Sequence, residues 1–300
     1  MVSSMHGEFC NGDSRGRELS IGKDEATAEH RTAPAHSGML LRLPIMDVKI
    51  STGSRDDFMA ELLHLSDHAM SSAYVCFVNV HMVVEAHRND EFCAIVNNAD
   101  VACPDGAPVA KSIGWFFGLK QQHMAGPDTL PMLVEAAGRY RKRIFLLGST
   151  EDVLESFVEQ AAIRFPNAVI CGYESPPFRA LTQEEDEALI QKINDSHADM
   201  IFVALGCPKQ EKWMAAHKGK VKGCMFGLGY AIPVFAGMAS RAPRWMIDHG
   251  LEWSFRLFSD PKRLFKRYVD TNSVFVRRVL IKWLASRWER VFLPGRRGVL

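Results

Sequence analysis

The sequence predicts an α/β protein, with a Rossmann-like parallel sheet flanked by helices and a C-terminal basic helical appendage. Short apolar runs alternate with longer amphipathic runs, a pattern typical of parallel strands joined by helices. Glycine or a short polar residue follows most of the apolar runs, where such sheets carry their ligand-binding loops. The last 60 residues hold 14 Lys and Arg against 5 Asp and Glu, a net charge of +9, although the whole chain carries only +1.

The chain divides into three predicted parts. Residues 1–38 are polar and charged without apolar periodicity, so we expect a disordered leader. Residues 39–240 are expected to form the α/β core, and residues 241–300 the basic amphipathic appendage, whose charge predicts an anionic partner such as a membrane or nucleic acid. No apolar run reaches the roughly 18 residues of a membrane span, and the polar N-terminus lacks a hydrophobic signal core. We therefore expect a cytoplasmic protein.

Strands are expected where apolar, β-branched and aromatic residues cluster, and helices where apolar residues recur with helical spacing. The expected strands span residues 43–50, 74–80, 101–103, 144–147, 169–172, 200–205 and 224–228. The expected core helices span residues 55–65, 107–117, 127–140, 151–164 and 182–196, with further helical stretches up to residue 98. Pro127 occupies an early helical position, and Thr182-Gln-Glu-Glu185 is a capping box.

The appendage is expected to be helical throughout. Between Val274 and Val291, apolar residues recur with helical spacing and basic residues lie between them. This pattern, with tryptophans at its edges, is typical of a helix at the interface of an anionic membrane. The alternative is a helix that packs on the core and leaves its basic face in solvent.

Asp105 is the first candidate for catalysis. A short apolar run ends at Pro104, Asp105 follows, and Gly106 is free to turn before a predicted helix. A carboxylate at the carboxyl end of a strand lies where open α/β sheets bind ligands. Asp105 is therefore either a catalytic base or a helix cap.

Four other predicted strands end in residues suited to a ligand: Asn79, Gly148, Gly206 and Gly229. Glycine at these positions lets backbone N–H groups approach a phosphate beside a helix N-terminus. Several such loops at strand ends predict a nucleotide or diphosphate ligand. Neither a P-loop nor a dinucleotide-binding glycine motif is present.

The segment Gly206-Cys-Pro-Lys-Gln-Glu-Lys-Trp213 is the most distinctive loop. Lys209 can neutralise a phosphate, and Gln210 can hydrogen-bond to a sugar or a uracil. The alternative is a solvated first turn of a helix. Asp128, in Gly126-Pro-Asp128, is similarly either a ligand contact or a cap.

Metal and disulfide sites are not expected. The seven cysteines are odd in number and form no Cys-x-x-Cys pair, which favours free thiols in a reducing compartment. No Asp-x-Asp pair of the kind that holds a metal on a nucleotide diphosphate is present. Another cation must then balance the charge of a leaving diphosphate.

Together these segments resemble the WecG/TagA/CpsF glycosyltransferases, bacterial enzymes of glycosyltransferase family 26. The matching segments are Asn79 with its following helix, Asn97-Asn-Ala-Asp-Val-Ala-Cys-Pro-Asp-Gly106, Gly126-Pro-Asp128, Phe145-Leu-Leu-Gly148, Gly206-Cys-Pro-Lys-Gln-Glu211, Arg241-Ala-Pro-Arg-Trp245 and Gly250-Leu-Glu-Trp253. The resemblance covers roughly residues 43–268. The Pro-Asp-Gly, Gly-Cys-Pro-Lys-Gln-Glu and Arg-Ala-Pro-Arg-Trp blocks, in this order, are highly specific.

The resemblance implies inverting, metal-independent transfer of a sugar from a UDP-sugar to a polyprenyl-diphosphate-linked saccharide. The donor would be UDP-N-acetylmannosamine, its uronate or UDP-glucose. The reaction would take place at the inner face of the cytoplasmic membrane, in cell-wall or exopolysaccharide biosynthesis. Asp105 matches the family's proposed base, and with an ordinary pKa near 4 it would be ionised at neutral pH.

The resemblance also implies a set of substrate contacts and no cofactor. Asn79 and Gln210 match positions that hold donor or acceptor, while basic appendage residues would reach the diphosphate. The expected substrate-binding residues are Asn79, Gly106, Gly126, Asp128, Gly148, Gly206, Lys209, Gln210, Gly229, Arg241, Arg244, Arg256, Arg263 and Lys266.

Two positions depart from the family pattern. Phe77 stands where many members have threonine, and Gly229-Tyr-Ala-Ile-Pro233 replaces a segment that contains an acid. The alternative function is therefore a catalytically altered protein of the same fold that binds a nucleotide sugar. A nucleic-acid partner is not expected, because no recognition motif accompanies the basic tail and the rest of the chain is acidic. A homo-oligomer in which the appendage completes a neighbour's site is one arrangement left open.

Overall fold

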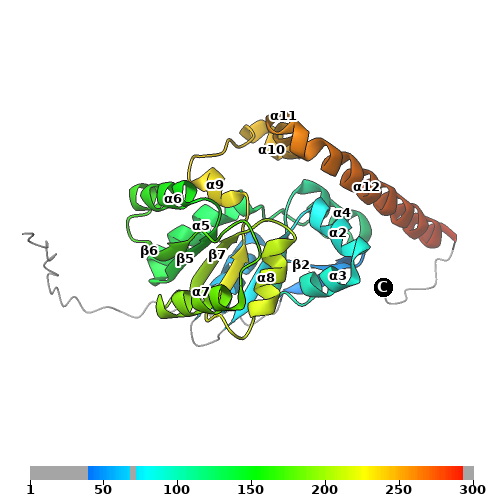
Figure 1. The fold of residues 1–300 in the computed structure, drawn as a ribbon. Helices are drawn as coiled ribbons and strands as arrows, with labels where there is room; N and C mark the ends of the chain where they lie inside the picture. The colour runs from blue at the N-terminus through cyan, green and yellow to red at the C-terminus, as the bar shows by residue number, and fades with distance from the viewer. Residues whose placement is uncertain (1–39, 68–71, 293–300) are drawn as a thin grey trace, which may run out of the picture. The chain divides into compact units, whose positions relative to one another are not determined.

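The computed structural model describes residues 40–67 and 72–292 (Figure 1). The predicted leader, residues 1–38, lies outside the described residues. A parallel sheet of six strands has helices on both faces, so the predicted α/β fold class is confirmed. Among the described helices, none is long and apolar enough to cross a membrane.

The six strands lie close to their predicted positions. They are β3 (Ala73–Val78), β4 (Val101–Pro104), β5 (Arg143–Gly148), β6 (Val169–Glu174), β7 (Met200–Ala204) and β8 (Cys224–Gly227). Their order across the sheet is β4-β3-β8-β7-β5-β6, and every neighbouring pair is parallel. All six carboxyl ends therefore point to one edge, and the loops that follow them meet there.

The single strand predicted at residues 43–50 is wrong, because the chain forms a hairpin there. Strands β1 (Leu41–Ile45) and β2 (Val48–Thr52) pair antiparallel, with Ile45 opposite Val48. Met46 makes the reversal with a positive φ of 52°, a conformation that few residues other than glycine adopt. Neither glycine nor asparagine occurs at this turn, so the sequence looks like one continuous strand.

Helices cover the two faces of the sheet in separate sets. One set is α1 (Arg55–Leu65), α5 (Gly126–Tyr140), α6 (Glu151–Arg164) and α9 (Ala231–Phe235), and the other is α2 (Val80–Arg88), α3 (Asp90–Asn97), α4 (Ala107–Phe117), α7 (Gln183–Asp195) and α8 (Lys209–His217). Strand side chains alternate between the two hydrophobic cores: Val75 and Phe77 join one, and Tyr74 and Cys76 the other.

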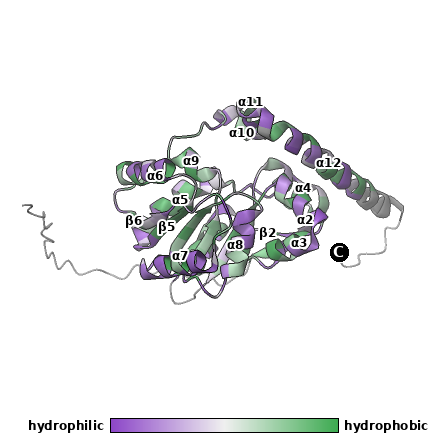
Figure 2. Ribbon diagram, in the orientation of Figure 1, coloured by the Kyte–Doolittle hydropathy of each residue, from purple (hydrophilic) through white to green (hydrophobic). Residues whose placement is uncertain are grey.

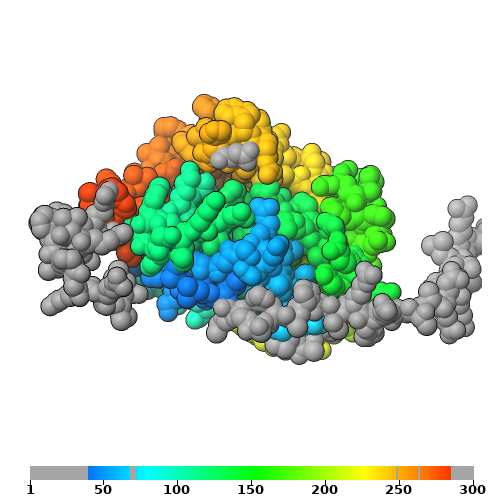
Figure 3. Space-filling model, turned by 180° about the vertical axis from the view of Figure 1, so that it is seen from behind, coloured from blue at the N-terminus to red at the C-terminus, as the bar shows by residue number. Residues whose placement is uncertain are grey.

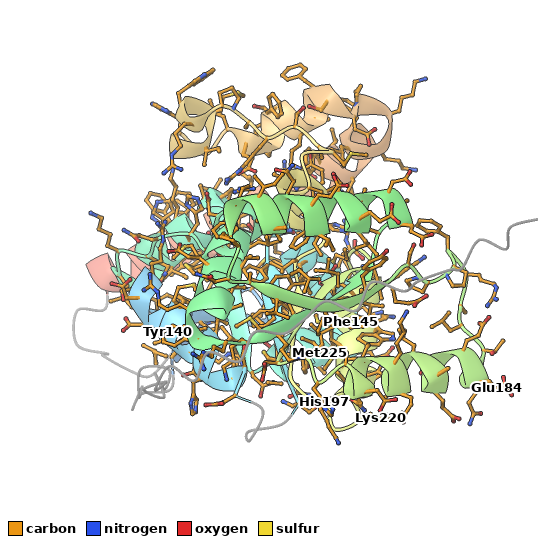
Figure 4. All side chains as sticks on the ribbon, turned by 90° about the vertical axis from the view of Figure 1, so that its left-hand side faces the viewer. Tyr140, Phe145, Glu184, His197, Lys220 and Met225 are labelled. Carbon is orange, nitrogen blue, oxygen red and sulfur yellow. The ribbon has the colours of Figure 1, made fainter. Side chains whose placement is uncertain are left out.

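Hydropathy and side-chain views agree with this layering. The central strands are hydrophobic, whereas the covering helices carry hydrophilic residues (Figure 2). Phe145 and Met225 lie within the sheet, and both are fully buried (Figure 4). Lys220 and Glu184 lie at the periphery of the same view. The capping box predicted at Thr182 is confirmed, since its side chain accepts a hydrogen bond from the Glu185 backbone.

Three helices form the appendage: α10 (Arg244–Asp248), α11 (Glu252–Ser259) and α12 (Pro261–Phe292). The appendage lies against the core (Figure 3). At this contact, a Cβ added to Gly250 would lie 3.0 Å from the Cβ of Ala107. Helix α12 packs along α2 through the buried Phe275 and Val279. Arg88 on α2 also forms two hydrogen bonds with Asp270 on α12, at 2.5 and 2.8 Å.

Candidate active site

A cavity of about 710 Å³ opens at the carboxyl ends of β3, β4, β7 and β8. Its floor consists of the loops that follow these strands, and its roof consists of α11 and the first half of α12. Of the predicted site residues, eight line this cavity: Asn79, Asp105, Gly106, Gly126, Gly206, Gln210, Gly229 and Arg256. The parallel sheet thus brings together residues that are far apart in sequence.

Asp105 directly follows β4 on the cavity wall. Its backbone N–H donates to the Val78 carbonyl at 3.0 Å, which fixes the loop against the neighbouring strand. The N-cap of α4 is Gly106, with a φ of 87°, and no side chain caps this helix. The helix-cap interpretation of Asp105 is therefore wrong, and its carboxylate is left to face the cavity.

The pKa of Asp105 is raised to about 7. Burial is the largest cause, and the nearby Glu252 and Asp128 carboxylates add to it, while Arg256 and a hydrogen bond from Asn79 oppose it. The expectation of an ordinary pKa near 4 is wrong, because the sequence does not show how the folded chain buries this group. A base with a pKa near the working pH accepts a proton more effectively than one with a pKa of 4.

Asn79 links Asp105 to helix α2. Its side-chain oxygen accepts a hydrogen bond from the Met82 backbone at 3.2 Å and caps the helix. That leaves its NH₂ group as the donor to the Asp105 carboxylate. The amide therefore orients the carboxylate while it holds the start of α2 in place.

Gln210 is buried in the cavity floor. Its Nε2 donates to Glu211 Oε1 at 2.7 Å and to the Gly227 carbonyl at 2.9 Å, and its Oε1 accepts from the Gly206 backbone at 3.2 Å. The amide thus ties two glycine loops together. Its partners in this structure are protein groups, so its predicted direct contact with substrate stays a prediction. Glu211 is also fully buried, and burial raises its pKa to about 7.

Arg241 connects the appendage to the core. Its guanidinium donates two hydrogen bonds of 2.8 Å to Asp128 on α5, and its Nε lies 3.6 Å from Glu252 on α11. Burial acts to raise the pKa of Asp128, but the hydrogen bonds from Arg241 lower it overall. Asp128 and Arg241 were both predicted to contact substrate, but the structure pairs them with each other just behind the cavity wall.

The remaining predicted residues do not line the cavity. Lys209 is exposed at the start of α8, Arg244 is exposed at the start of α10, and Lys266 is exposed on α12. Gly148 instead allows a close approach between β5 and β7, since a Cβ there would lie 2.8 Å from the Ala204 backbone. The side chain of Arg263 lies outside the described residues.

The family relationship follows from comparison with known proteins. A model of the "Glycosyl transferase WecG/TagA/CpsF family" matches residues 43–289. The chain belongs to this family. Four of the motif blocks that carried the resemblance contribute residues to the cavity floor, and Gly250-Leu-Glu-Trp253 contributes residues to its roof.

Individual relatives are also similar to this chain, and two of them share the name "N-acetylglucosaminyldiphosphoundecaprenol N-acetyl-beta-D-mannosaminyltransferase". The protein from Bacillus subtilis (strain 168) is 33% identical over 193 residues, which cover 64% of this chain and 73% of the relative. The protein from Staphylococcus aureus (strain MW2) is 26% identical over 200 residues, which cover 66% of this chain and 77% of the relative.

Both departures from the family pattern lie at the cavity. Phe77 and Pro233 line its wall, so they shape the space available to a ligand. Phe77 is also part of the hydrophobic core, which explains how an apolar residue is accommodated there.

Three polar residues that the sequence did not single out also line the cavity: His81, Glu252 and Arg267. Glu252 lies in the Gly-Leu-Glu-Trp block, so the resemblance could have identified it. His81 lies in the helix that follows Asn79, another matching segment, whereas Arg267 has no such signal. Within the described chain, His81 Nδ1 and Arg267 Nε are buried without a hydrogen-bond partner, and burial together with the nearby Arg267 lowers the pKa of His81 to about 4.

Proposed function

We propose that this chain transfers a sugar from a UDP-sugar to a polyprenyl-diphosphate-linked saccharide in cell-wall or exopolysaccharide biosynthesis. The observation that carries the proposal is Asp105, a carboxylate with a pKa of about 7 in a large cavity lined by family motif blocks. The names of the relatives favour N-acetylmannosamine as the sugar and N-acetylglucosamine on the lipid diphosphate as the acceptor. N-acetylmannosamine uronate and glucose are the other donor sugars to test.

Asp105 acts as the general base in a single displacement. Its carboxylate takes the proton of an acceptor hydroxyl, and that oxygen forms a bond to the anomeric carbon of the donor. The bond from the anomeric carbon to the diphosphate breaks, and its electron pair leaves with UDP. Attack opposite the leaving group inverts the configuration at the anomeric carbon.

Cationic side chains are expected to balance the charge on the leaving diphosphate, as a metal does in other transferases. Arg256 lines the cavity with its guanidinium 4.2 Å from the centroid of the Tyr230 ring, and Arg267 lines the part beneath α12. Metal independence stays a prediction, and it requires full activity in the presence of EDTA.

The appendage is expected to bind the membrane that carries the acceptor. Five apolar side chains at helical spacing along α12 are each at least half exposed: Phe265, Val269, Val276, Leu280 and Leu284. Exposed Lys262, Lys266, Arg277 and Arg278 lie on the same helix. Apolar side chains with basic neighbours favour the interface of an anionic bilayer.

The test of the function is UDP release by the full chain. UDP-N-acetylmannosamine, its uronate and UDP-glucose are each combined with a short polyprenyl-diphosphate-N-acetylglucosamine, with and without EDTA. Release that requires both donor and acceptor supports transfer. Saturable UDP binding without release from any donor would instead support the altered binding protein that Phe77 and Pro233 suggest.

The membrane contact is tested by the double substitution Phe265→Asp and Leu280→Asp. It should weaken co-sedimentation with vesicles that contain anionic lipid, because both side chains belong to the exposed stripe on α12. The control is Ile163→Asp, which changes an exposed apolar residue on the surface helix α6, outside the appendage. Equal binding by both variants would contradict the assignment to α12.

A further inference from the structure

Glu252 is the second carboxylate that lines the cavity, and it lies in the roof. It is the first residue of α11, and its side chain is one-quarter exposed. An acidic residue at this position commonly stabilises a helix N-terminus without any other role. Glu252 differs from that simple case, because it lines the cavity and its charge acts on Asp105.

The partner of Glu252 leaves its carboxylate largely available. Both terminal nitrogens of Arg241 donate to Asp128 at 2.8 Å, and only Nε, 3.6 Å away, faces Glu252. This Nε makes no hydrogen bond within the described chain. Arg241 therefore holds Glu252 in position by charge, while the oxygens of Glu252 keep their capacity to accept hydrogen bonds.

The charges around Asp105 indicate what this part of the cavity can bind. Asp105 is influenced by Glu252 and Arg256 on α11, by Asp128 on α5 and by the amide of Asn79. Asp105, Glu252 and Asp128 are carboxylates, although Asp128 is paired with Arg241. Arg256 supplies a positive charge that suits the leaving diphosphate. A neutral sugar ring has several hydroxyl groups that can donate to carboxylate oxygens, and it fits this environment.

Nitrogen groups also line the cavity. Arg267 on α12 has a buried Nε and His81 on α2 has a buried Nδ1, and neither atom has a hydrogen-bond partner in the described chain. Cationic and hydrogen-bonding nitrogens suit an anionic group. The cavity therefore offers carboxylates for sugar hydroxyl groups and nitrogen donors for a phosphate.

We propose that Glu252 determines acceptor specificity, by accepting a hydrogen bond from a hydroxyl group of the acceptor sugar next to the one that Asp105 deprotonates. This inference rests on the proposed function. It assigns to the appendage a contact with the sugar itself, in addition to the contacts expected with the diphosphate and the membrane.

The test compares wild type with Glu252→Gln in the UDP-release assay, with UDP-N-acetylmannosamine and the short polyprenyl-diphosphate-N-acetylglucosamine. The acceptor KM should rise about tenfold, since glutamine offers a neutral acceptor in place of a charged one. The acidic limb of the pH profile should move to lower pH by about half a unit or more, since a like charge beside Asp105 is removed. This shift follows from the charge of Glu252 whatever it contacts, so the acceptor KM is the readout of the contact with the sugar.

A panel of acceptors that each lack one hydroxyl identifies the contact. One deletion should impair wild type about tenfold and have little further effect on Glu252→Gln, because both changes remove the same hydrogen bond. Glu252→Asp, which keeps the charge, should retain the wild-type pH profile. The control is Glu135→Gln, a surface carboxylate on α5 that pairs with Arg139.

The outcomes separate the two proposals. If the wild-type chain transfers no sugar, the proposed function is wrong and this inference is wrong with it. If wild type is active and Glu252→Gln matches it in acceptor KM, the inference alone is overturned, whether or not the pH profile moves.

Discussion

The floor and the roof of the cavity are built in different ways. In the floor, helix α8 buries Gln210, Glu211, Met214 and His217, and the Gln210 amide joins two loops by hydrogen bonds. In the roof, helix α11 has no buried residue at all. Ion pairs at the rim connect the roof to the core, notably the pair between Arg241 and Asp128.

This difference indicates how the protein divides its tasks. Buried hydrogen bonds keep the floor and Asp105 in one geometry, as positioned catalysis requires. Elements with few buried contacts open at lower free energy than the core. Helix α11 is therefore the part of the roof that opens most readily, while α12 stays packed on α2 through Phe275 and the floor stays in place.

The largest effect is expected from Asp105→Asn on the floor. Loss of the base should lower kcat by about 10²–10⁴-fold. The thermal midpoint should not fall, because asparagine removes a carboxylate whose ionisation burial disfavours. In wild type, kcat/KM should fall about tenfold per pH unit below the pKa of about 7, because only the ionised carboxylate accepts a proton. A pH series of UDP-release rates tests both points. Retained turnover in the variant would remove Asp105 as the base.

A smaller effect is expected from Arg241→Gln, which disconnects the roof. Loss of the two hydrogen bonds to Asp128 should displace α11 and lower kcat/KM by roughly 10–100-fold. Hydrogen exchange should become faster in α11 and stay unchanged in β4 and α8. Arg139→Gln, which removes a surface pair with Glu135, is the control. If exchange rises equally in the floor, the two regions are not independent.

The smallest effect is expected from Glu211→Gln in the floor. Because burial raises the pKa of Glu211 to about 7, its contribution to stability is complete below the unfolded value and is lost as the pH rises through 7. Glutamine resembles the protonated form at every pH. The variant should therefore melt several degrees above wild type at pH 8 and equally at about pH 4, by differential scanning fluorimetry. A variant that is less stable at pH 8 would show that the charge of Glu211 stabilises the floor.

Much of the fold could be predicted because its signals are local. Apolar runs bounded by glycine or proline located the strands of the main sheet, and the Thr182 capping box located the start of α7. The β1–β2 hairpin was not predicted, because its two-residue turn, Met46-Asp47, lacks the glycine that usually accompanies aspartate in such turns. The position of Asp105 at a strand end could also be predicted, since it depends only on where β4 ends.

What the sequence determined by itself was therefore the element order, the loops at the strand ends, the family motifs and the basic tail. Only the tertiary structure decided the chemical state and the partners of the site residues. The raised pKa of Asp105, the inward-facing amide of Gln210 and the pair between Arg241 and Asp128 all depend on residues distant in sequence. The physical reason is that burial and charge act through space, so a residue's ionisation and hydrogen bonds depend on everything folded around it.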